Sequence, residues 1–321
     1  MEHMMNAVVL TKKTSVKDVC VSQVEIPKVV SGWVLIKVKA FGMNHSEQML
    51  REFEIENDYI NKPVIPGIEC VGVVEDPSDT DLQKGQKVIA MMGGMGRSFD
   101  GSYAEYALLP RHHIFTVDSD LSWEKLAAIP ETYFTAWGSL FECLRLKKDD
   151  ILLIRGASCA LGYAALQIAK AVGCKVVVTT HRKKYFSLLR DADEIIMDNG
   201  TLTGNVNGIT KALDLIGPRY ILDTLTAVEK GATVCQTGIL GGVYVLDGFD
   251  PIKDIPNGVY LTGFYSNFPT QEIVDDMFAF INENKLEPIY GPVYRFRDIK
   301  EAMCMQESGK AGGKIVVVVE E

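Results

Sequence analysis

A short turn with a glycine at each end is the part of the sequence best suited to bind a phosphorylated ligand. The turn Gly156–Gly162 follows the apolar run Ile151–Arg155 and leads into apolar residues at helical spacing, Leu161, Ala165, Ile168 and Val172. A helix that begins at such a turn presents unpaired backbone N–H groups and the positive end of its dipole, which together suit a diphosphate. The residues predicted to contact it are Gly156, Ser158, Ala160, Leu161 and Gly162.

The glycine pattern of this turn is incomplete for a dinucleotide site. The fingerprint needs one glycine for the turn, one for close approach of the ligand and one for helix–strand packing. Gly162 suits the packing position, but Cys159 stands at the approach position. The stretch alone therefore leaves an alternative open, a parallel sheet with a glycine turn and no nucleotide.

Basic residues, and no acid, follow the next apolar run. Gly173 ends the helical pattern as a C′ glycine would, and Lys175–Thr179 predicts a second buried strand. The chain then continues as Thr180-His181-Arg182-Lys183-Lys184, with no acid before Asp191. Folds that prefer NAD place Asp or Glu here to accept a hydrogen bond from the ribose 2′-OH.

A 2′-phosphate at this position would meet Arg182 and a neighbouring lysine. Each charge-assisted contact of this kind is worth about 1.5–3 kcal/mol. The pattern therefore favours NADP(H), and the alternative is a solvated basic start of a helix. Thr180, His181, Arg182 and Lys183 are the predicted contacts of this half of the cofactor.

The elements around the turn predict a doubly wound parallel sheet. Strand, turn, helix and strand form a βαβ unit, whose crossover makes the two strands parallel. Further short apolar runs extend the sheet to about six strands. They are Ala192–Met197, Ala212–Ile216, Thr233–Thr237 and Val259–Phe264.

The first third of the chain predicts a β-rich, barrel-like module. Short runs separated by glycine and proline predict strands at Asn6–Leu10, Val19–Val24, Trp33–Ala40, Val71–Glu75, Gln86–Met91 and Ser102–Leu109. A helix is expected to begin at Ser122, and a longer helix is expected over Thr135–Arg145.

The C-terminal end of the chain returns to this module. A helix over Gln271–Asn284 precedes two strands, Pro292–Phe296 and Lys314–Val319, which lack the α/β alternation. We therefore predict two domains. One is β-rich and formed by residues 1–128 and 268–321, and the other binds the dinucleotide and is formed by residues 129–267.

Composition excludes several classes of partner. The 321 residues carry a net charge of −9, which argues against nucleic acid because phosphate backbones need a basic surface. The seven cysteines are scattered and odd in number, unlike a disulfide framework or a zinc knuckle. No apolar run reaches the length of about eighteen residues expected of a membrane span. We expect a cytoplasmic protein with a small-molecule partner.

Several blocks of the sequence resemble one family. The blocks FGMNHSEQM, VIPGIECVGVV, DGSYAEYALLP, LAAIPETYFTAWGSL and LIRGASCALGYAALQIAKAVGCKVVVTT are similar to the medium-chain dehydrogenase/reductase superfamily. Within it they are most similar to the zinc-free quinone oxidoreductase (zeta-crystallin-like) branch. The resemblance covers nearly the whole chain and implies an α/β fold, in which a Rossmann doubly wound parallel sheet is inserted in a β-rich GroES-like catalytic domain.

The sequence departs from the zinc-dependent members of the superfamily at two ligand positions. Asn44 stands where those members have cysteine, and Ile68 stands where they have histidine. Zinc needs three N, S or O ligands from the protein, so we expect no metal site here. Hydride transfer without a Lewis acid suits conjugated acceptors such as quinones and enones, because delocalisation stabilises the developing oxyanion.

Asn44 and Tyr59 are the candidates for catalysis. Asn44 matches an asparagine that such quinone reductases place near the nicotinamide or the acceptor oxygen, and its alternative role is to hold a turn. Tyr59 is a candidate proton donor, although tyrosines in such loops commonly serve packing, and Tyr103 is a second candidate of the same kind.

The resemblance also carries over further contacts to NADP(H). Thr135 resembles the threonine near the nicotinamide-side phosphate, and Lys314 resembles a C-terminal lysine that approaches the cofactor. The remaining contacts follow the last two strands of the sheet: Thr237, Gly238, Ile239, Leu240, Phe264 and Tyr265.

Together these features predict an NADPH-dependent oxidoreductase that passes hydride to a quinone or a similar conjugated carbonyl. Two alternatives remain open, a 2-alkenal or enone reductase with the same cofactor and a non-catalytic NADPH-binding or sensor protein. Relatives dimerise through the edge strand that GVYLTGFY would form, so a homodimer is expected.

Overall fold

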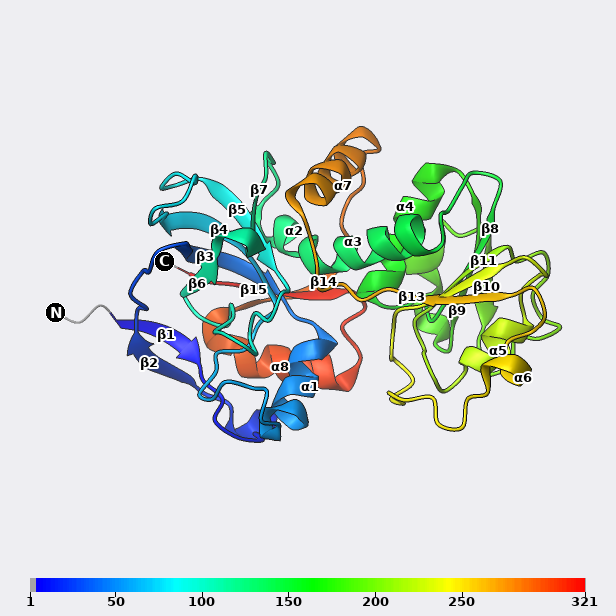
Figure 1. Cartoon of the computed structure of the whole chain (residues 1–321), viewed down its shortest axis with the longest axis horizontal. Helices are drawn as coiled ribbons and strands as arrows, with labels where there is room; N and C mark the ends of the chain where they lie inside the picture. The colour runs from blue at the N-terminus through cyan, green and yellow to red at the C-terminus, as the bar shows by residue number, and fades with distance from the viewer. Residues whose placement is uncertain (1–3, 321) are drawn as a thin grey trace. The chain divides into compact units, whose positions relative to one another are not determined.

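The computed structural model describes residues 4–320 (Figure 1). Contacts between residues divide the chain into two compact units. The first consists of residues Met1–Glu131, Asn267–Phe280 and Pro288–Glu321, and the second of Thr132–Ser266 and Ile281–Glu287. The boundaries expected from the sequence stay a proposal, and this division differs from them at residues 129–131, 267 and 281–287. The last segment is the longest of these differences. There the carbonyl of Glu287 accepts a hydrogen bond from Gln167 of the second unit at 2.7 Å.

The first unit is built on a seven-stranded sheet in the order β14-β15-β3-β4-β5-β7, with β6 paired to β3. Its strands are β3 (Trp33–Gly42), β4 (Glu69–Asp76), β5 (Lys87–Met91), β6 (Tyr106–Pro110), β7 (Ile114–Thr116), β14 (Tyr290–Arg295) and β15 (Lys314–Val318). Strands β1 (Met4–Val8) and β2 (Val21–Glu25) form a separate antiparallel pair.

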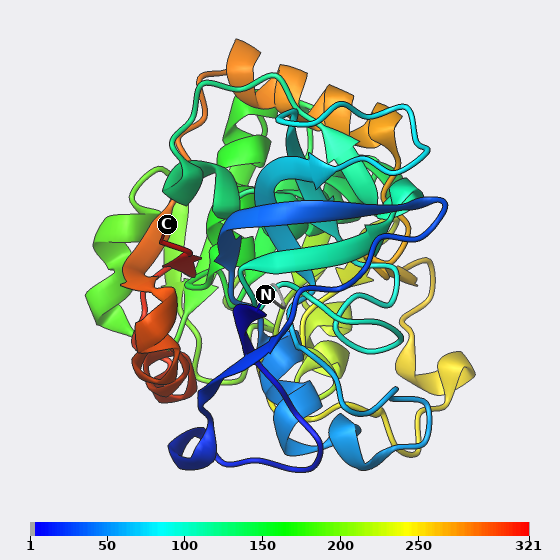
Figure 2. The same cartoon turned by 90° about the vertical axis from the view of Figure 1, so that its left-hand side faces the viewer.

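Strand β3 is the longest strand of this unit and organises it. Its sequence WVLIKVKAFG buries most of its side chains, and the strand pairs with β4, β6 and β15. Figure 2 shows β3 in blue across the front of the unit with β6 beside it. Because Val316 pairs with Gly42, the C-terminal strand brings Lys314 next to the end of β3. The pairing makes the C-terminal segment part of the sheet of the first unit.

Helices complete the first unit at the ends of these strands. They are α1 (His45–Glu52), α2 (Trp123–Ala127) and α8 (Ile299–Ser308), with short 3₁₀ turns η1 (Val16–Asp18), η2 (Glu54–Glu56), η3 (Arg111–His113) and η6 (Phe296–Asp298). The hydroxyl of Ser122 accepts a hydrogen bond from the Lys125 N–H at 3.5 Å, so α2 begins where the sequence predicts. Helices α3 (Pro130–Trp137) and α7 (Gln271–Glu283) each contain a boundary of the two units.

The second unit is a six-stranded parallel sheet in the order β10-β9-β8-β11-β12-β13. The strands are β8 (Ile151–Arg155), β9 (Lys175–Thr180), β10 (Glu194–Met197), β11 (Lys211–Asp214), β12 (Thr233–Gln236) and β13 (Tyr260–Gly263). Around them lie α4 (Ala160–Val172), α5 (Ile221–Thr226), α6 (Pro251–Asp254) and the 3₁₀ helix η5 (Lys183–Leu189). Figure 1 shows α4 on one face of the sheet and α5 on the other. This order is that of a Rossmann fold, as predicted.

One expectation about helices needs correction, and one helix was missed. The longer helix predicted over 135–145 is instead the end of α3 followed by a π-helical turn, η4 (Gly138–Cys143). The wider turn brings Gly138 against Phe264, where an added Cβ would lie 2.0 Å from the ring. Helix α8 was not predicted, although Gly309 ends it in a left-handed conformation with φ of 60°. Within residues 4–320, no helix combines the length and apolar character needed to cross a bilayer.

Candidate functional site

In the first unit, three strands and a helix bring Asn44, Glu69 and Lys314 together. Strand β3 ends at Gly42, and Asn44 follows as the residue that precedes α1. Glu69 is the first residue of β4, and Lys314 is the first residue of β15. Because β4 and β15 both pair antiparallel with β3, their first residues lie beside its last ones. We refer to Asn44, Glu69 and Lys314 as the polar triad.

The polar triad is closely hydrogen-bonded and buried. Nζ of Lys314 lies 2.6 Å from Oε1 of Glu69 and 2.5 Å from Oδ1 of Asn44. Nδ2 of Asn44 donates to the same Glu69 oxygen at 2.8 Å. Glu69 is 0 % exposed and Lys314 is 3 % exposed. The second Glu69 oxygen accepts the Glu131 N–H at 2.8 Å, so both ends of the carboxylate are satisfied.

Gly42 makes this approach possible. A Cβ at that position would lie 2.3 Å from Cε of Lys314 and 2.7 Å from Oε1 of Glu69. Both distances are far below van der Waals contact, so any larger residue would push the lysine away from the carboxylate. The glycine of the FGMN block therefore serves the polar triad directly.

Glu47 fixes the backbone beside the polar triad. Its carboxylate accepts the Asn44 N–H at 2.8 Å and the Ile68 N–H at 3.1 Å. Burial raises the pKa of Glu47, and the positive charge of Lys314 opposes the rise. Asn44 is thus both the N-cap residue of α1 and a member of the triad, and its contact with the nicotinamide or the acceptor oxygen stays a prediction.

The amide group of Asn44 makes one short and two long hydrogen bonds. Nδ2 of Asn44 donates to the Glu69 carboxylate at 2.8 Å. Its contacts with the Glu47 carboxylate and the Gly42 carbonyl are longer, 3.4 and 3.5 Å. The carbonyl end is held by Lys314. The carboxamide is therefore fixed in one orientation, and its role toward a ligand stays a prediction.

The structure does not bring Tyr59 into the polar triad. Its side chain is 60 % exposed, and its hydroxyl accepts a long hydrogen bond from Asn57 at 3.4 Å. Tyr103 is the opposite case, fully buried and stacked on Phe41 with ring centroids 4.5 Å apart. Its hydroxyl has no hydrogen-bond partner in the described part of the chain. Burial, followed by the charges of Glu47 and Glu69, raises its pKa well above the ordinary value.

In the second unit, the predicted glycine turn has the geometry of a dinucleotide fold. Gly156 has φ of +81°, which favours glycine, and its N–H donates to the Thr179 hydroxyl at 3.0 Å. A Cβ at Gly162 would lie 2.3 Å from the Ala157 carbonyl oxygen, so this glycine allows the helix to pack against the strand. The residues between them that were predicted as contacts, Ser158, Ala160 and Leu161, lie at the start of α4.

Cys159 replaces the middle glycine and caps the helix. Its Sγ accepts a hydrogen bond from the Gly162 N–H at 3.4 Å, so it occupies a donor of the α4 N-terminus. Burial raises the pKa of the Cys159 thiol to about 11, which keeps the side chain neutral. The residues present still fit a diphosphate, because the turn, the packing glycine and the helix dipole are all in place.

The end of β9 gathers the residues predicted to contact the adenosine half. The hydroxyls of Ser158 and Thr180 lie 2.8 Å apart, and the Thr180 hydroxyl accepts the Arg182 N–H at 3.2 Å. Nε of Arg182 donates to the imidazole of His181 at 2.9 Å. Lys183 is exposed at the start of η5. The structure therefore brings this predicted set together on one side of the turn.

A buried ion pair behind this turn was missed by the sequence analysis. Arg155, which is 0 % exposed, contacts Asp198 at 3.0 Å and Asp223 at 2.8 Å. Asp198 also accepts from the Thr179 hydroxyl at 3.1 Å. Although burial alone would raise it, the hydrogen bonds from Arg155 and Gly200 hold the pKa of Asp198 below its ordinary value. The acid nearest the end of β9 is thus paired with an arginine.

The loops after β12 and β13 carry the remaining predicted contacts. The hydroxyl of Thr237 lies 2.9 Å from that of Ser139, which in turn donates to the Thr135 carbonyl at 2.7 Å. A Cβ at Gly238 would lie 2.3 Å from the Leu215 carbonyl oxygen, so the loop passes close to the end of β11.

The other residues of these loops differ in exposure. Ile239 is half-buried, whereas Leu240 and Tyr265 are exposed. Phe264 packs edge-on against Phe134 at 5.7 Å. Ser139, which links Thr135 to Thr237, was not predicted from the sequence.

No group of three or more His, Cys, Asp or Glu side chains is placed to hold a metal ion within residues 4–320. The two positions at which zinc-dependent relatives have ligands hold Asn44, in the polar triad, and Ile68, an apolar side chain that is 4 % exposed.

Two family models match the chain. The alcohol dehydrogenase GroES-like domain matches residues 30–119, and the zinc-binding dehydrogenase model matches residues 190–317. Human quinone oxidoreductase is 32% identical over 320 residues, covering 92% of each chain. The synaptic vesicle membrane protein VAT-1 homolog-like of Mus musculus is 24% identical over 350 residues, which cover 99% of this chain and 82% of the relative.

Solved structures share the fold. The quinone oxidoreductase from Coxiella burnetii superposes with a TM-score of 0.85 at 20% identity, over 99% of this chain and 100% of its own. The Bacillus subtilis protein yhfP with NAD bound superposes with a TM-score of 0.81 at 22% identity, over 98% of this chain and 99% of its own. At these identities the likeness establishes the architecture, a Rossmann sheet with a GroES-like domain.

Proposed function

Because the chain belongs to the quinone oxidoreductase branch of the medium-chain dehydrogenase/reductase superfamily, we propose that it is a zinc-independent NADPH-dependent reductase of quinones or similar conjugated carbonyls. The family consists of oxidoreductases that bind a nicotinamide cofactor. The observation that carries the finer proposal is the pairing of Lys314 with Glu69.

The charge of the polar triad supports catalysis without zinc. A zinc site collects anionic or neutral donors around a divalent cation. Here the one carboxylate of the triad already has a cation, since Lys314 lies 2.6 Å from Glu69. A second cation would be repelled by that ammonium, and Ile68 has no donor atom to offset the repulsion.

The residues at the end of β9 support NADPH. A 2′-phosphate there would meet Arg182 and Lys183, whereas the nearby carboxylate of Asp198 is held by Arg155. The turn from Gly156 to Gly162 and the start of α4 would hold the diphosphate. When bound, the cofactor supplies the hydride, and the protein supplies binding and orientation.

The polar triad would supply hydrogen bonds to the acceptor. Reduction of a conjugated carbonyl places negative charge on its oxygen, and donors aimed at that charge lower the barrier. Lys314 uses two of its three N–H groups on Asn44 and Glu69, and Asn44 uses one amide hydrogen on Glu69. We propose that the remaining hydrogens of Asn44 and Lys314 serve the acceptor or the cofactor. Tyr59 stays a candidate proton donor.

The test is oxidation of NADPH and NADH with a panel of acceptors. We expect turnover with quinones and at least tenfold higher kcat/KM with NADPH than with NADH. Turnover with enals alone would establish the enone reductase instead, and tight NADPH binding without turnover would establish a binding or sensor protein. Metal analysis of the purified protein is the companion measurement, and one bound zinc per chain would overturn the zinc-independent mechanism.

A homodimer is proposed on the edge of the parallel sheet. β13 is the last strand of the sheet order, and Tyr260 on it is 62 % exposed. An exposed edge strand is commonly paired or covered in stable proteins. Light scattering should give twice the 35.5 kDa mass of the chain, and a mass equal to one chain would exclude the dimer.

A further inference from the structure

A cavity of about 450 Å³ lies in the first unit, apart from the polar triad. It is bounded by the β1–β2 pair, by the segment 61–65 and by strand β6, and it includes none of Asn44, Glu69 or Lys314. Small-molecule pockets commonly have volumes of about 300–1,000 Å³. Neither the proposed reaction nor the predicted cofactor contacts use this cavity.

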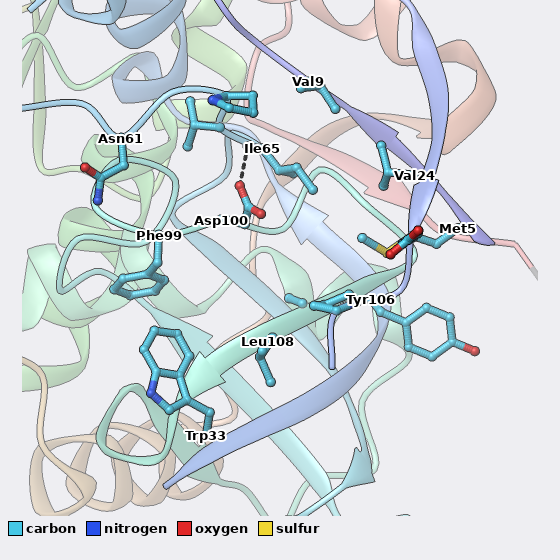
Figure 3. A pocket seen from close by; sticks show the side chains of 15 residues that line it. Met5, Val9, Val24, Trp33, Asn61, Ile65, Phe99, Asp100, Tyr106 and Leu108 are labelled. Atoms are coloured by element: carbon cyan, nitrogen blue, oxygen red, sulfur yellow. Dashed lines mark hydrogen bonds between the residues drawn. The ribbon is translucent and has the colours of Figure 1, made fainter. Parts of the chain in front are cut away.

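Its walls are mainly apolar and aromatic. Figure 3 shows the rings of Trp33 and Phe99 close together, with Leu108 and Met5 farther along the same wall. The rings of Trp33 and Phe99 meet edge to face with centroids 5.4 Å apart. Tyr106 adds a third ring. Such walls favour a ligand with an aromatic or branched apolar body.

The polar side chains of the cavity offer acceptors. Oδ1 of Asp100 accepts the Ile65 N–H at 2.8 Å, which leaves Oδ2 for a ligand. Asn61 donates through Nδ2 to the Ser98 carbonyl at 2.5 Å, which leaves its carbonyl oxygen. Two lining side chains also carry donors, the hydroxyl of Tyr106 and the indole N–H of Trp33.

The charge of the cavity has one sign. Glu25 lines it together with Asp100, and the carboxylate of Glu25 has no hydrogen-bond partner among residues 4–320. No lysine, arginine or histidine from the described part of the chain is among the lining residues. An ammonium group would therefore find carboxylate oxygens and the rings of Trp33 and Phe99.

We propose that this cavity binds a small organic cation, a protonated amine carried on an aromatic or branched apolar body. The ammonium group donates to Asp100, and the apolar body lies against Trp33, Phe99 and Leu108. A neutral ligand of the same shape gains the apolar contacts but leaves the acceptors unpaired. An anion is repelled by both carboxylates.

The surroundings of Asp100 agree with this assignment. The side chain is exposed over much of its surface, yet burial of the carboxyl group raises its pKa, and the hydrogen bond from Ile65 opposes the rise. The carboxylate at the cavity has thus lost part of its hydration. A bound cation replaces that hydration and favours the ionised form.

Calorimetric titration of the intact protein tests the proposal with three probes of similar shape. They are 2-phenylethylamine, its neutral analogue 2-phenylethanol and its anionic analogue 3-phenylpropanoate. We expect the amine to bind at least tenfold more tightly than the alcohol, and the anion to give no measurable binding. Equal affinity of amine and alcohol, or no binding of the amine at millimolar concentration, overturns the proposal. Neither cofactor nor turnover is needed, so the result is independent of the proposed reductase activity.

Two variants locate the site. Asp100→Asn keeps the acceptor for the Ile65 N–H and should weaken amine binding at least tenfold while leaving the alcohol unchanged. Leu108→Trp fills the cavity and should abolish binding of both. Asp120→Asn, which removes an exposed carboxylate outside the cavity, should bind the amine like the original protein. Amine affinity that is unchanged in folded Asp100→Asn places the cation elsewhere and overturns the assignment. The comparison of probes on the unaltered chain remains decisive if a variant fails to fold.

Discussion

The ammonium of Lys314 lies 2.6 Å from the carboxylate of Glu69, and both side chains are almost fully buried. A buried carboxylate is costly unless it is paired and hydrogen-bonded, and this one has Lys314, Asn44 and the Glu131 N–H around it. The lysine thus gives Glu69 its counter-charge inside the protein.

Breaking this pair should strongly destabilise the first unit. Lys314→Met leaves Glu69 buried without a cation, and we expect a loss of about 3–5 kcal/mol in the free energy of unfolding. Lys314→Met combined with Glu69→Gln should recover much of that loss, because the uncompensated charge is gone. Denaturant unfolding measures both.

Lys310→Met is the matched control for this prediction. Lys310 is exposed and lies in the loop between α8 and β15, so its loss should cost less than about 0.5 kcal/mol. The role assigned to Lys314 is refuted if Lys314→Met is as mild as Lys310→Met.

Arg182 should decide the choice of cofactor. Arg182→Ala removes a charge-assisted contact to a 2′-phosphate, so the KM for NADPH should rise about tenfold while that for NADH stays constant. Steady-state kinetics with both cofactors measures the effect. Arg190→Ala removes an exposed arginine from the end of η5 and should change neither KM. A parallel rise in both KM values for Arg182→Ala would indicate a structural role.

The sequence was sufficient to predict the features that depend on local pattern. The turn Gly156–Gly162 and the left-handed Gly173 follow from periodicity and glycine placement, and both are present in the structure. The parallel order of the sheet follows from the βαβ rule. Such features need information from only a few neighbouring residues.

Contacts between distant segments could not be predicted in the same way. Lys314 and Asn44 are 270 positions apart, and only the pairing of β15 with β3 brings them together. Arg155 looked like the end of an apolar strand, but its burial depends on Asp198 and Asp223 from other parts of the unit. The π-helical turn at Gly138 escaped detection because one extra residue per turn hardly alters a helical pattern.

Cys159 should limit how tightly the turn holds a diphosphate. Its Sγ takes the Gly162 N–H, so Cys159→Gly releases a backbone donor. We expect cofactor affinity to rise about two- to tenfold, the value of one net hydrogen bond. Cys159→Ser keeps an acceptor at the N-cap and should leave affinity nearly unchanged. Isothermal titration with NADPH separates the two variants, and equal affinities would show that the thiol does not compete with the ligand.

His113 should make stability depend on pH below neutrality. It is half-buried and stacked on Phe99 with centroids 5.7 Å apart, and a Cβ at Gly93 would lie 1.7 Å from its ring. Burial, followed by the charge of His112, lowers the pKa of His113 from 6.5 to about 4. Between these values the unfolded chain binds more protons than the folded one, so stability is lost as pH falls from 6.5 through about 4.

Replacing His113 by phenylalanine should remove this dependence. His113→Phe keeps an aromatic ring against Phe99 but removes the titratable imidazole. Between neutral pH and pH ~4, its free energy of unfolding should therefore fall by about 1–2 kcal/mol less than that of the original protein, after allowance for solvent screening. His45→Gln, at an exposed histidine on α1, is the matched control for the loss of an imidazole. Urea unfolding at a series of pH values measures the difference. If the original protein and His113→Phe lose stability in parallel, His113 is already charged in the folded state and its surroundings do not disfavour the proton.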